Sequence, residues 1–300
     1  MEQYISPLTL WGLHGRMLRT PPPKPTAREL LFVYGHHSSL ERWRGMMELL
    51  AHDYAVTMPD LPGFGGMDSV YTIGKSATID TLADYLAEFI RQHYPPTKKI
   101  TIVGMSLGFA IITRMLQRHP DLTKRVDKLV SLFGFASGKD FTMPPKRLAL
   151  YSVSSRVFSL PVLAKLYRSV FLNSYVLGST YHKTPNAKEK FKGLSQQEIL
   201  QNMAFEIKLW QDDDTQTYMK TGNEILTLDN TLVKIPLPVF HISVAHDRFL
   251  DNARVEAGFR KIFTEYHLVA ELTNANHAPT QIATKKQAEA FIPSAVLKSL

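Results

Sequence analysis

Short runs of apolar residues alternate with segments of helical periodicity along most of this 300-residue chain. The apolar runs are rich in β-branched and aromatic residues, and such alternation is typical of βαβ units around a parallel sheet. The expected strands are 29–34, 54–58, 100–103, 129–133, 239–244 and 267–272, and the expected helices are 77–93, 107–118, 252–263 and 285–298. A hairpin is expected at 8–19, with its turn near 12–15. The pattern therefore predicts an α/β fold with a mostly parallel central sheet and flanking helices.

The alternation stops between residues 138 and 232, where helical periodicity dominates and no convincing strand pattern occurs. Within this stretch, Ser195-Gln196-Gln197-Glu198 is a capping-box sequence, which predicts a helix that runs to about Trp210. The strand rhythm then resumes after Pro238. The sequence thus predicts an α/β core formed by residues 1–137 and 233–300, into which residues 138–232 are inserted as a helical cap.

The chain contains no cysteine, so disulfides, thiolate zinc sites and cysteine nucleophiles are excluded. Its first residues have no basic leader before an apolar stretch, and we therefore expect no signal peptide. The longest uncharged runs, 100–113 and 169–182, are shorter than the ~18 apolar residues that a membrane-spanning helix needs. These features predict a soluble protein, and we expect a cytoplasmic location.

The formal net charge is +8, and it is concentrated in one stretch. Between Lys139 and Lys192 there are ten Lys and Arg residues against two acids, so this stretch carries the whole excess. No zinc-finger, helix-turn-helix or RNA-recognition pattern accompanies it, and we expect no nucleic-acid partner. A basic face that includes Lys183, Lys188 and Lys190 would favour weak contact with an anionic membrane surface. A solvated helical face is the alternative interpretation.

Gly104-Met105-Ser106-Leu107-Gly108 is a G-x-S-x-G pentapeptide that lies directly after an expected strand and directly before an expected helix. This context favours a nucleophile elbow, because so tight a turn needs small residues two positions on either side of the serine. The turn raises the serine oxygen above the sheet, and the following helix points its positive end at the reacting centre. We therefore predict that Ser106 is a nucleophile.

A serine nucleophile needs a base, and the base needs an orienting acid. His277 follows the last expected strand and is the histidine that we predict as the base. Asp247, just after the preceding expected strand, is the predicted acid. Its rival is Asp251, but a helix N-cap role at the start of the next helix explains that residue without catalysis. We interpret His246 as structural, because a sequence neighbour of the acid points away from it on an extended chain.

The oxyanion of an acyl-transfer reaction needs two N–H donors. We expect the backbone N–H of Leu107, directly after the nucleophile, and the backbone N–H of His36, in the loop after the strand at 29–34. The neighbouring His37 suggests a metal, but in an extended loop the two side chains should point to opposite sides, and no acidic partner set is evident. We therefore expect no metal and no cofactor.

With these residues assembled, the chain resembles the α/β-hydrolase superfamily, in its single-domain branch with a helical cap. Besides the elbow, the acid and the base, the segments that carry the resemblance are Tyr34-Gly35-His36 with Trp43, Asp60-Leu61-Pro62-Gly63-Phe64-Gly65 and the strand 235–247. Tyr34 replaces the histidine that is usual before Gly35, and this departure affects the expected geometry of the oxyanion donors. The resemblance does not extend to residues 138–232.

The residues and the resemblance together imply a serine hydrolase that cleaves an ester-like acyl bond, with a small apolar acyl substrate. An acyltransferase or carbon–carbon bond hydrolase with the same triad remains an alternative, as does a ligand-binding protein that keeps the fold without turnover. Serine in place of aspartate argues against haloalkane dehalogenase and epoxide hydrolase chemistry. Apolar and aromatic residues of 151–181 are expected mainly to pack the cap, and some of them to line the acyl pocket. The oligomeric state is not determined by the sequence.

Overall fold

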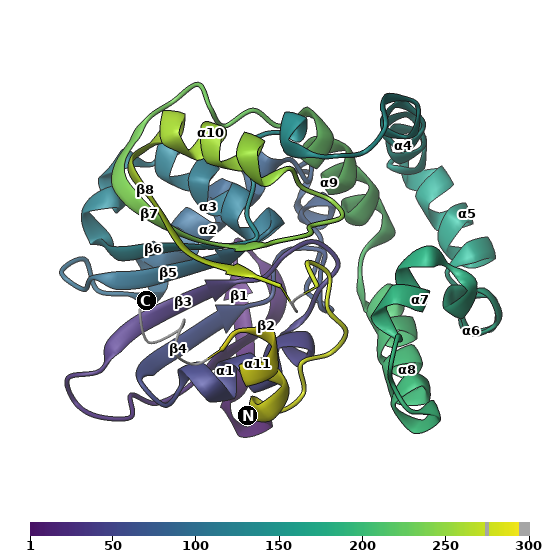
Figure 1. Cartoon of the computed structure of the whole chain (residues 1–300), viewed down its shortest axis with the longest axis horizontal. Helices are drawn as coiled ribbons and strands as arrows, with labels where there is room; N and C mark the ends of the chain where they lie inside the picture. The colour runs from purple at the N-terminus through teal and green to yellow at the C-terminus, as the bar shows by residue number, and fades with distance from the viewer. Residues whose placement is uncertain (274–275, 294–300) are drawn as a thin grey trace.

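The computed structural model describes residues 1–273 and 276–293. Within these residues, eight strands form one sheet in the order β1-β2-β4-β3-β5-β6-β7-β8 (Figure 1). Their bounds are β1 Ile5–Leu10, β2 Leu13–Arg19, β3 Arg28–Val33, β4 Tyr54–Pro59, β5 Ile100–Met105, β6 Val126–Leu132, β7 Ile235–Val244 and β8 Phe263–Leu272. β2 pairs antiparallel with β1 and β4, and every other neighbouring pair is parallel. The predicted α/β class with a mostly parallel sheet is confirmed.

Helices cover both faces of this sheet. One face carries α2 Ile79–His93, α3 Leu107–Arg118 and α10 Asn252–Ile262, and the other carries α1 Arg44–Leu50 and α11 Lys285–Phe291 (Figure 1). Short 3-10 helices connect the main elements: η1 Glu2–Tyr4, η2 Leu40–Trp43, η3 Val70–Ile73, η4 Pro120–Arg125, η5 Gly138–Asp140 and η6 Tyr181–Lys183. Because both faces are covered, a central strand such as β5 is buried at every position and appears in the sequence as a continuous apolar run.

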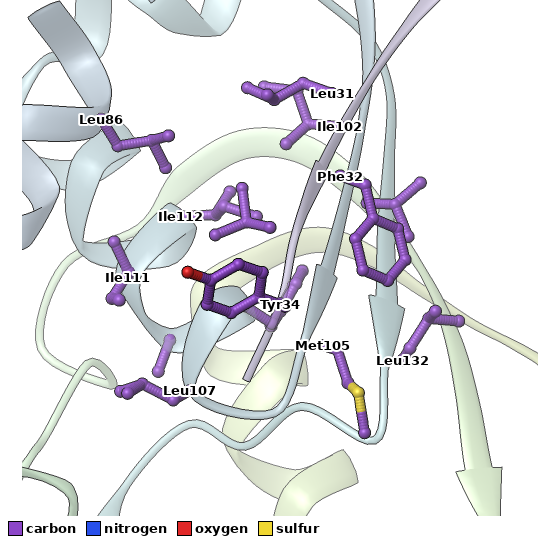
Figure 2. Packing of buried hydrophobic residues seen from close by; sticks show 14 of the residues in the cluster. Leu31, Phe32, Tyr34, Leu86, Ile102, Met105, Leu107, Ile111, Ile112 and Leu132 are labelled. Carbon is purple, nitrogen blue, oxygen red and sulfur yellow. The ribbon is translucent and has the colours of Figure 1, made fainter. Parts of the chain in front are cut away.

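The core lies between the sheet and these helices. In α2, Ile79, Leu82, Leu86 and Ile90 recur at helical spacing and are buried, as the periodicity predicts. Figure 2 shows Leu86 on the side of the sheet that α2 and α3 cover, whereas Phe32 points to the opposite face. The ring of Phe32 lies 5.4 Å from that of Trp43, next to α1. The strand sequence thus supplies apolar side chains to both layers.

Residues 138–232, which we call the helical segment, lie between β6 and β7 and contain helices but no named strand among the described residues. The helices are α4 Pro145–Phe158, α5 Pro161–Phe171, α6 Ser174–Thr180, α7 Pro185–Lys190, α8 Gln196–Asp212 and α9 Thr215–Thr227. Ser195 caps α8 with both hydrogen bonds of a capping box, as predicted. Both α4 and α5 contact α9, and Figure 1 shows α4 to α8 extending beyond one edge of the core. Among the described helices, none is long and apolar enough to cross a bilayer.

The structure differs from the sequence prediction at several ends. The hairpin turns at Trp11 and Gly12, both with positive φ, rather than near residues 12–15. Helix α1 was not predicted, because it has only seven residues and contains Gly45. A Cβ at Gly45 would collide with the backbone of Thr284, so the glycine allows α1 to pack beside α11. The expected final helix ends at Phe291, and the part of that prediction beyond residue 293 lies outside the described residues.

Gly138 permits a close backbone approach where the chain leaves the sheet, and its substitution gives a direct test of the packing. A Cβ at Gly138 would overlap the backbone carbonyl of Leu226 in α9. Gly138→Ala should therefore lower the free energy of unfolding by about 1–3 kcal/mol. The matched control is Gly178→Ala in α6, where the nearest atom, Ile207 Cδ1, is 4.0 Å from the new Cβ. This change should raise stability by about 0.5–1 kcal/mol. Urea unfolding followed by circular dichroism measures both, and equal effects would contradict the packing.

Candidate active site

Ser106 occupies a strained turn between β5 and α3. Its backbone has φ 48° and ψ −117°, a conformation that side-chain-bearing residues rarely adopt. Its N–H donates to the carbonyl of Leu132 at 2.9 Å, which fixes the turn to β6. A Cβ at Gly104 would lie 2.6 Å from the Cα of Phe109, and one at Gly108 would collide with the carbonyl of Val33. The glycines two residues before and after Ser106 are therefore required sterically, as the sequence motif indicates.

The structure brings the side chains of Ser106, His277 and Asp247 into one hydrogen-bonded chain. Nε2 of His277 lies 2.9 Å from Oγ of Ser106, and Nδ1 of His277 lies 2.6 Å from Oδ2 of Asp247. Oδ1 of Asp247 accepts the backbone N–H groups of Phe249 and Leu250 at 2.8 and 3.1 Å. The segment after β7 thus holds the carboxylate, and the carboxylate orients the imidazole.

The protonation of this chain follows from the environment of Asp247. Burial alone would raise the pKa of Asp247, but the hydrogen bond and charge of His277, with the two backbone N–H groups, outweigh burial and lower it. The ionised carboxylate accepts a hydrogen bond from the N–H at Nδ1 of His277. The Nε2 lone pair is then left to accept the hydroxyl proton of Ser106, which is the arrangement that a general base requires.

The rival acid and the neighbouring histidine lie elsewhere. Asp251 caps α10, where its carboxylate accepts the backbone N–H of Arg254 at 3.1 Å, so its N-cap position agrees with the sequence interpretation. His246 is exposed to solvent. Its place in the sequence next to Asp247 therefore does not bring it into the buried part of the site.

The two expected backbone donors flank the elbow. Leu107 is the first residue of α3, and the first N–H groups of a helix have no acceptor within that helix. The loop after β3, which contains His36, passes close to the serine, because a Cβ at Gly35 would lie 3.2 Å from the Cβ of Ser106. Both donors therefore come from backbone that is next to Ser106, and their binding of an oxyanion stays a prediction.

The side chain of His36 turns toward α9. Its Nε2 lies 3.1 Å from the carbonyl of Tyr218 and 3.0 Å from Oγ1 of Thr221. A carbonyl only accepts, so Nε2 carries the hydrogen and the imidazole is anchored as a donor. Burial lowers the pKa of His36 to about 4, and the ring stays neutral near pH 7. The side chain thus ties the expected oxyanion loop to the helical segment.

The expectation that His36 and His37 point to opposite sides of an extended loop was wrong. His37 has a positive φ of 54°, so the loop is not extended there, and both rings contact Tyr218, at 4.4 and 5.4 Å. Nδ1 of His37 is occupied by Asp213 at 2.8 Å. Within residues 1–273 and 276–293, no group of three or more His, Asp or Glu side chains is arranged to hold a metal ion.

Tyr34, the departure from the family pattern, connects β3 to the glycine-rich loop after β4. Its buried hydroxyl donates to Oδ1 of Asp60 at 3.0 Å and accepts the N–H of Leu61 at 2.7 Å. Burial raises the pKa of Asp60 to about 8, although Arg16 opposes the shift. Through one hydroxyl, Tyr34 therefore links the ends of the neighbouring strands β3 and β4. In the sequence, Tyr34 precedes Gly35 and His36 follows it.

A buried ion network, which no pattern in the sequence predicts, links the helical segment to the loop of His277. Glu206 of α8 is fully buried and binds Arg42 at 3.1 Å and Lys190 at 2.8 Å. Burial would raise the pKa of Glu206, but these cations lower it to about 2; burial lowers the pKa of Lys190 to about 8. Arg42 also donates to the carbonyl of Pro279 and accepts the N–H of Ile282.

Two sequence expectations are corrected here. Lys190 does not belong to a basic surface face, because its side chain is only 4% exposed and points to Glu206. The apolar and aromatic residues of 151–181 are expected mainly to pack the cap and in part to line the pocket, and among the described ones Tyr151 lines the cavity. Several of the others, including Leu160, Leu166 and Tyr175, are exposed on the outer surface instead. Helical periodicity shows that a helix has an apolar side, but it does not show what that side faces.

A cavity of about 290 Å³ opens beside Ser106 and His277. Polar groups of Arg42, Lys190 and the His36–His37 loop line part of it. The remaining wall is largely apolar or aromatic and includes Trp43, Met105, Phe135, Phe141, Met143, Tyr151, Tyr218, Ile225, Leu226 and Phe249. An apolar group of small size therefore fits next to the serine.

Comparisons with known proteins agree with this architecture. Residues 30–279 match the family model described as alpha/beta hydrolase fold. An AB hydrolase superfamily protein of Gibberella zeae is 27% identical over 130 residues, which are 43% of this chain and 43% of that protein, so the match spans less than half of that relative. A solved hydrolase from Pseudomonas aeruginosa PA01 superposes with a TM-score of 0.67 at 15% identity, covering 98% of this chain and 97% of that one. The 2-hydroxy-6-oxo-6-phenylhexa-2,4-dienoate hydrolase from Rhodococcus sp. strain RHA1 has a TM-score of 0.64 at 18% identity, with 98% and 96% covered. These two structural similarities establish a shared fold.

Buried neutral histidines beside the site should make stability depend on pH. Burial lowers the pKa of His241 to about 3, and its ring, only 2% exposed, contacts Oγ of Ser131 at 2.9 Å. Below an unfolded pKa of ~6.5 the unfolded chain binds a proton that folded His241 does not, so the stabilisation by neutral His241 is complete above that pH and is lost as pH falls toward 3. The loss of stability caused by His241→Gln should therefore shrink from pH 7 to pH 5, by about 1.4 kcal/mol per unit at most.

Urea unfolding of wild type and variant at both pH values measures this difference. The control is Leu268→Gln, which changes an exposed residue of the neighbouring strand and no titratable group. If the cost of His241→Gln is the same at pH 5 and pH 7, His241 is not held neutral by the fold.

Proposed function

This chain belongs to the alpha/beta hydrolase fold family, and we propose that it is a serine hydrolase of the carboxylesterase type that cleaves an ester-like acyl bond. The observation that supports this function best is the hydrogen-bonded chain from Ser106 through His277 to Asp247. Its serine lies on a strained turn, at the N-terminus of α3 and beside a cavity. A hydroxyl, a base and an orienting acid in this order are the parts that covalent acyl transfer needs.

In the proposed reaction, Nε2 of His277 takes the proton of Ser106 while Oγ bonds to the acyl carbon. The backbone N–H groups of His36 and Leu107 donate to the oxygen of the tetrahedral intermediate. His277 then gives its proton to the leaving-group oxygen as the bond to that oxygen breaks. Water, deprotonated by His277, then attacks the acyl carbon of the acyl-enzyme. The bond from that carbon to Oγ breaks, the carboxylic acid leaves, and His277 returns the proton to Ser106. Asp247 keeps Nδ1 protonated and stabilises the imidazolium in both steps.

The helical segment acts in this proposal as a cap, inserted at 138–232 into a core of residues 1–137 and 233–300. Met143, Tyr151 and Tyr218 of the segment line the cavity together with Ser106 and His277. The apolar and aromatic wall favours a small apolar acyl group over a charged one at the reacting carbon. Product analysis with a competing alcohol distinguishes hydrolysis from acyl transfer by the same residues.

A fluorophosphonate should label Ser106 and no other residue, because only an activated serine attacks such a phosphorus centre. Ser106→Ala should abolish the label and lower kcat for a short-chain ester on the order of 10⁴–10⁶-fold. Ser243→Ala, at another buried serine, should keep both label and activity. Peptide mapping by mass spectrometry locates the label. Failure to label Ser106 in a protein that hydrolyses no ester would favour a ligand-binding protein without turnover. Near-normal hydrolysis by Ser106→Ala would assign the nucleophile to another residue.

Substitutions at Asp247 and Asp251 should have different effects, the first on kcat and the second on stability. Asp247→Asn leaves a neutral partner for Nδ1 of His277 and should reduce kcat on the order of 10⁴-fold. Asp251→Asn keeps a good N-cap residue for α10, so kcat should be retained and stability reduced by about 1 kcal/mol or less. Steady-state kinetics and thermal unfolding of the two variants give the comparison. The opposite pattern would assign the acid to Asp251.

A further inference from the structure

Two consecutive helices of the helical segment expose apolar side chains along one stripe each. In α4 the stripe has the spacing i, i+3, i+7, and in α5 it has the spacing i, i+4, i+8, so each stripe lies along one side of its helix. The side chains are 41–76% exposed, and we name them the outer face: Leu150, Val153 and Val157 of α4, and Val162, Leu166 and Val170 of α5. Leu160, between the helices, and Phe171 are also exposed.

The outer face is not needed to hold these helices in place. Both helices contact α9, and buried Ser155 and Ala164 lie on other sides of α4 and α5 than the stripes. The two helices also pack on each other, and Figure 1 shows them among the helices that extend beyond one edge of the sheet. Single exposed apolar residues are ordinary, but six of them in two stripes, on helices that pack on each other, favour an interaction site.

The charge around the outer face has one sign. Residues 145–180 contain five Lys and Arg residues and no Asp or Glu. Two of the five turn inward: Nε of Arg156 donates to Asn223, and Arg168 donates to the carbonyl of Asp213. Lys146, Arg147 and Lys165 are exposed. The occupant of the outer face must therefore accept apolar side chains and tolerate several uncompensated positive charges.

We propose that the outer face docks on the surface of an anionic lipid bilayer. Apolar side chains at helical spacing, flanked by Lys and Arg, are the features of helices that lie in a membrane interface. Anionic headgroups would compensate Lys146, Arg147 and Lys165 while the apolar stripes enter the acyl boundary. A second copy of the chain fits less well, because pairing the same faces would bring like charges together.

The same helix connects this surface to the cavity. Tyr151 of α4 lines the cavity, whereas Leu150 and Val153 beside it are exposed. If Ser106 is the nucleophile, a point that rests on the proposed function, a docked molecule holds its acyl cavity one helix away from the lipid. Lipid-borne acyl compounds are then the substrate class that this placement serves.

Co-sedimentation of the full chain with vesicles tests the docking. Phosphatidylcholine vesicles that contain phosphatidylglycerol should bind the protein, and phosphatidylcholine alone should bind it much less. Binding should weaken with salt, because the Debye length falls from ~10 Å at 0.1 M to ~3 Å at 1 M. Lys146→Gln, Arg147→Gln and Lys165→Gln together should weaken binding on the order of 100-fold. Leu166→Gln with Val170→Gln should weaken it about tenfold or more.

The matched control is Leu232→Gln with Leu268→Gln, two exposed apolar residues outside the outer face, which should leave vesicle binding unchanged. Hydrolysis of a short-chain water-soluble ester should be the same in all these variants, so a loss of binding does not reflect unfolding. No binding to phosphatidylglycerol vesicles, equal binding to both vesicle types, or unchanged binding by the outer-face variants overturns the proposal. A dimer in sedimentation velocity would also overturn it, if only the outer-face variants lose the dimer and the protein does not bind vesicles. Normal vesicle binding without any ester hydrolysis would reject the proposed function but would still support the docking surface.

Discussion

The site depends on one close contact, between the first turn of α3 and the end of β3. Gly108 lies so near the carbonyls of Val33 and Tyr34 that a methyl side chain at this position would push α3 away from the end of β3. This contact sets the position of the helix N-terminus relative to the sheet. It thereby places the strained Ser106, the N–H of Leu107 and the loop of His36 within one small volume. A larger residue at Gly108 would displace all three relative to one another, although its side chain would touch none of the proposed reacting atoms.

The buried ion network adds a second constraint, on the arrangement of the helical segment. Arg42 of the core and Lys190 of the segment share the carboxylate of Glu206, and the three side chains are at most 5% exposed. Taking such charges out of water is costly, so the network is weak evidence for stability. It is specific, however, because shifting α8 would leave buried charges without partners. The network therefore selects one position of the segment over the cavity.

The sequence was sufficient for features that local geometry dictates. The G-x-S-x-G pentapeptide predicted the turn at Ser106, and the N-capping residues predicted where α8 and α10 begin. Their positions directly after expected strands also selected Asp247 and His277, which the fold brings together. It was not sufficient where the answer depends on which faces meet. Arg42 and Glu206 are 164 positions apart, and no local pattern announces their pairing. In the same way, the apolar periodicity of α4 and α5 predicted helices correctly but did not reveal that their stripes face outward.

The distances along the chain between site partners have a consequence for how the protein fails. Ser106 and His277 are 171 positions apart, and Arg42 holds the loop of His277 through Pro279 and Ile282. Residues 276–284 of that loop belong to no helix or strand and are held by single hydrogen bonds, whereas β5 is paired with β3 and β6 along its length. Segments with few contacts open at lower free energy than the sheet that carries them. Gradual denaturation should therefore separate base from nucleophile while the sheet persists, and the rate of hydrolysis then reports on the closure of one loop rather than on the integrity of the fold.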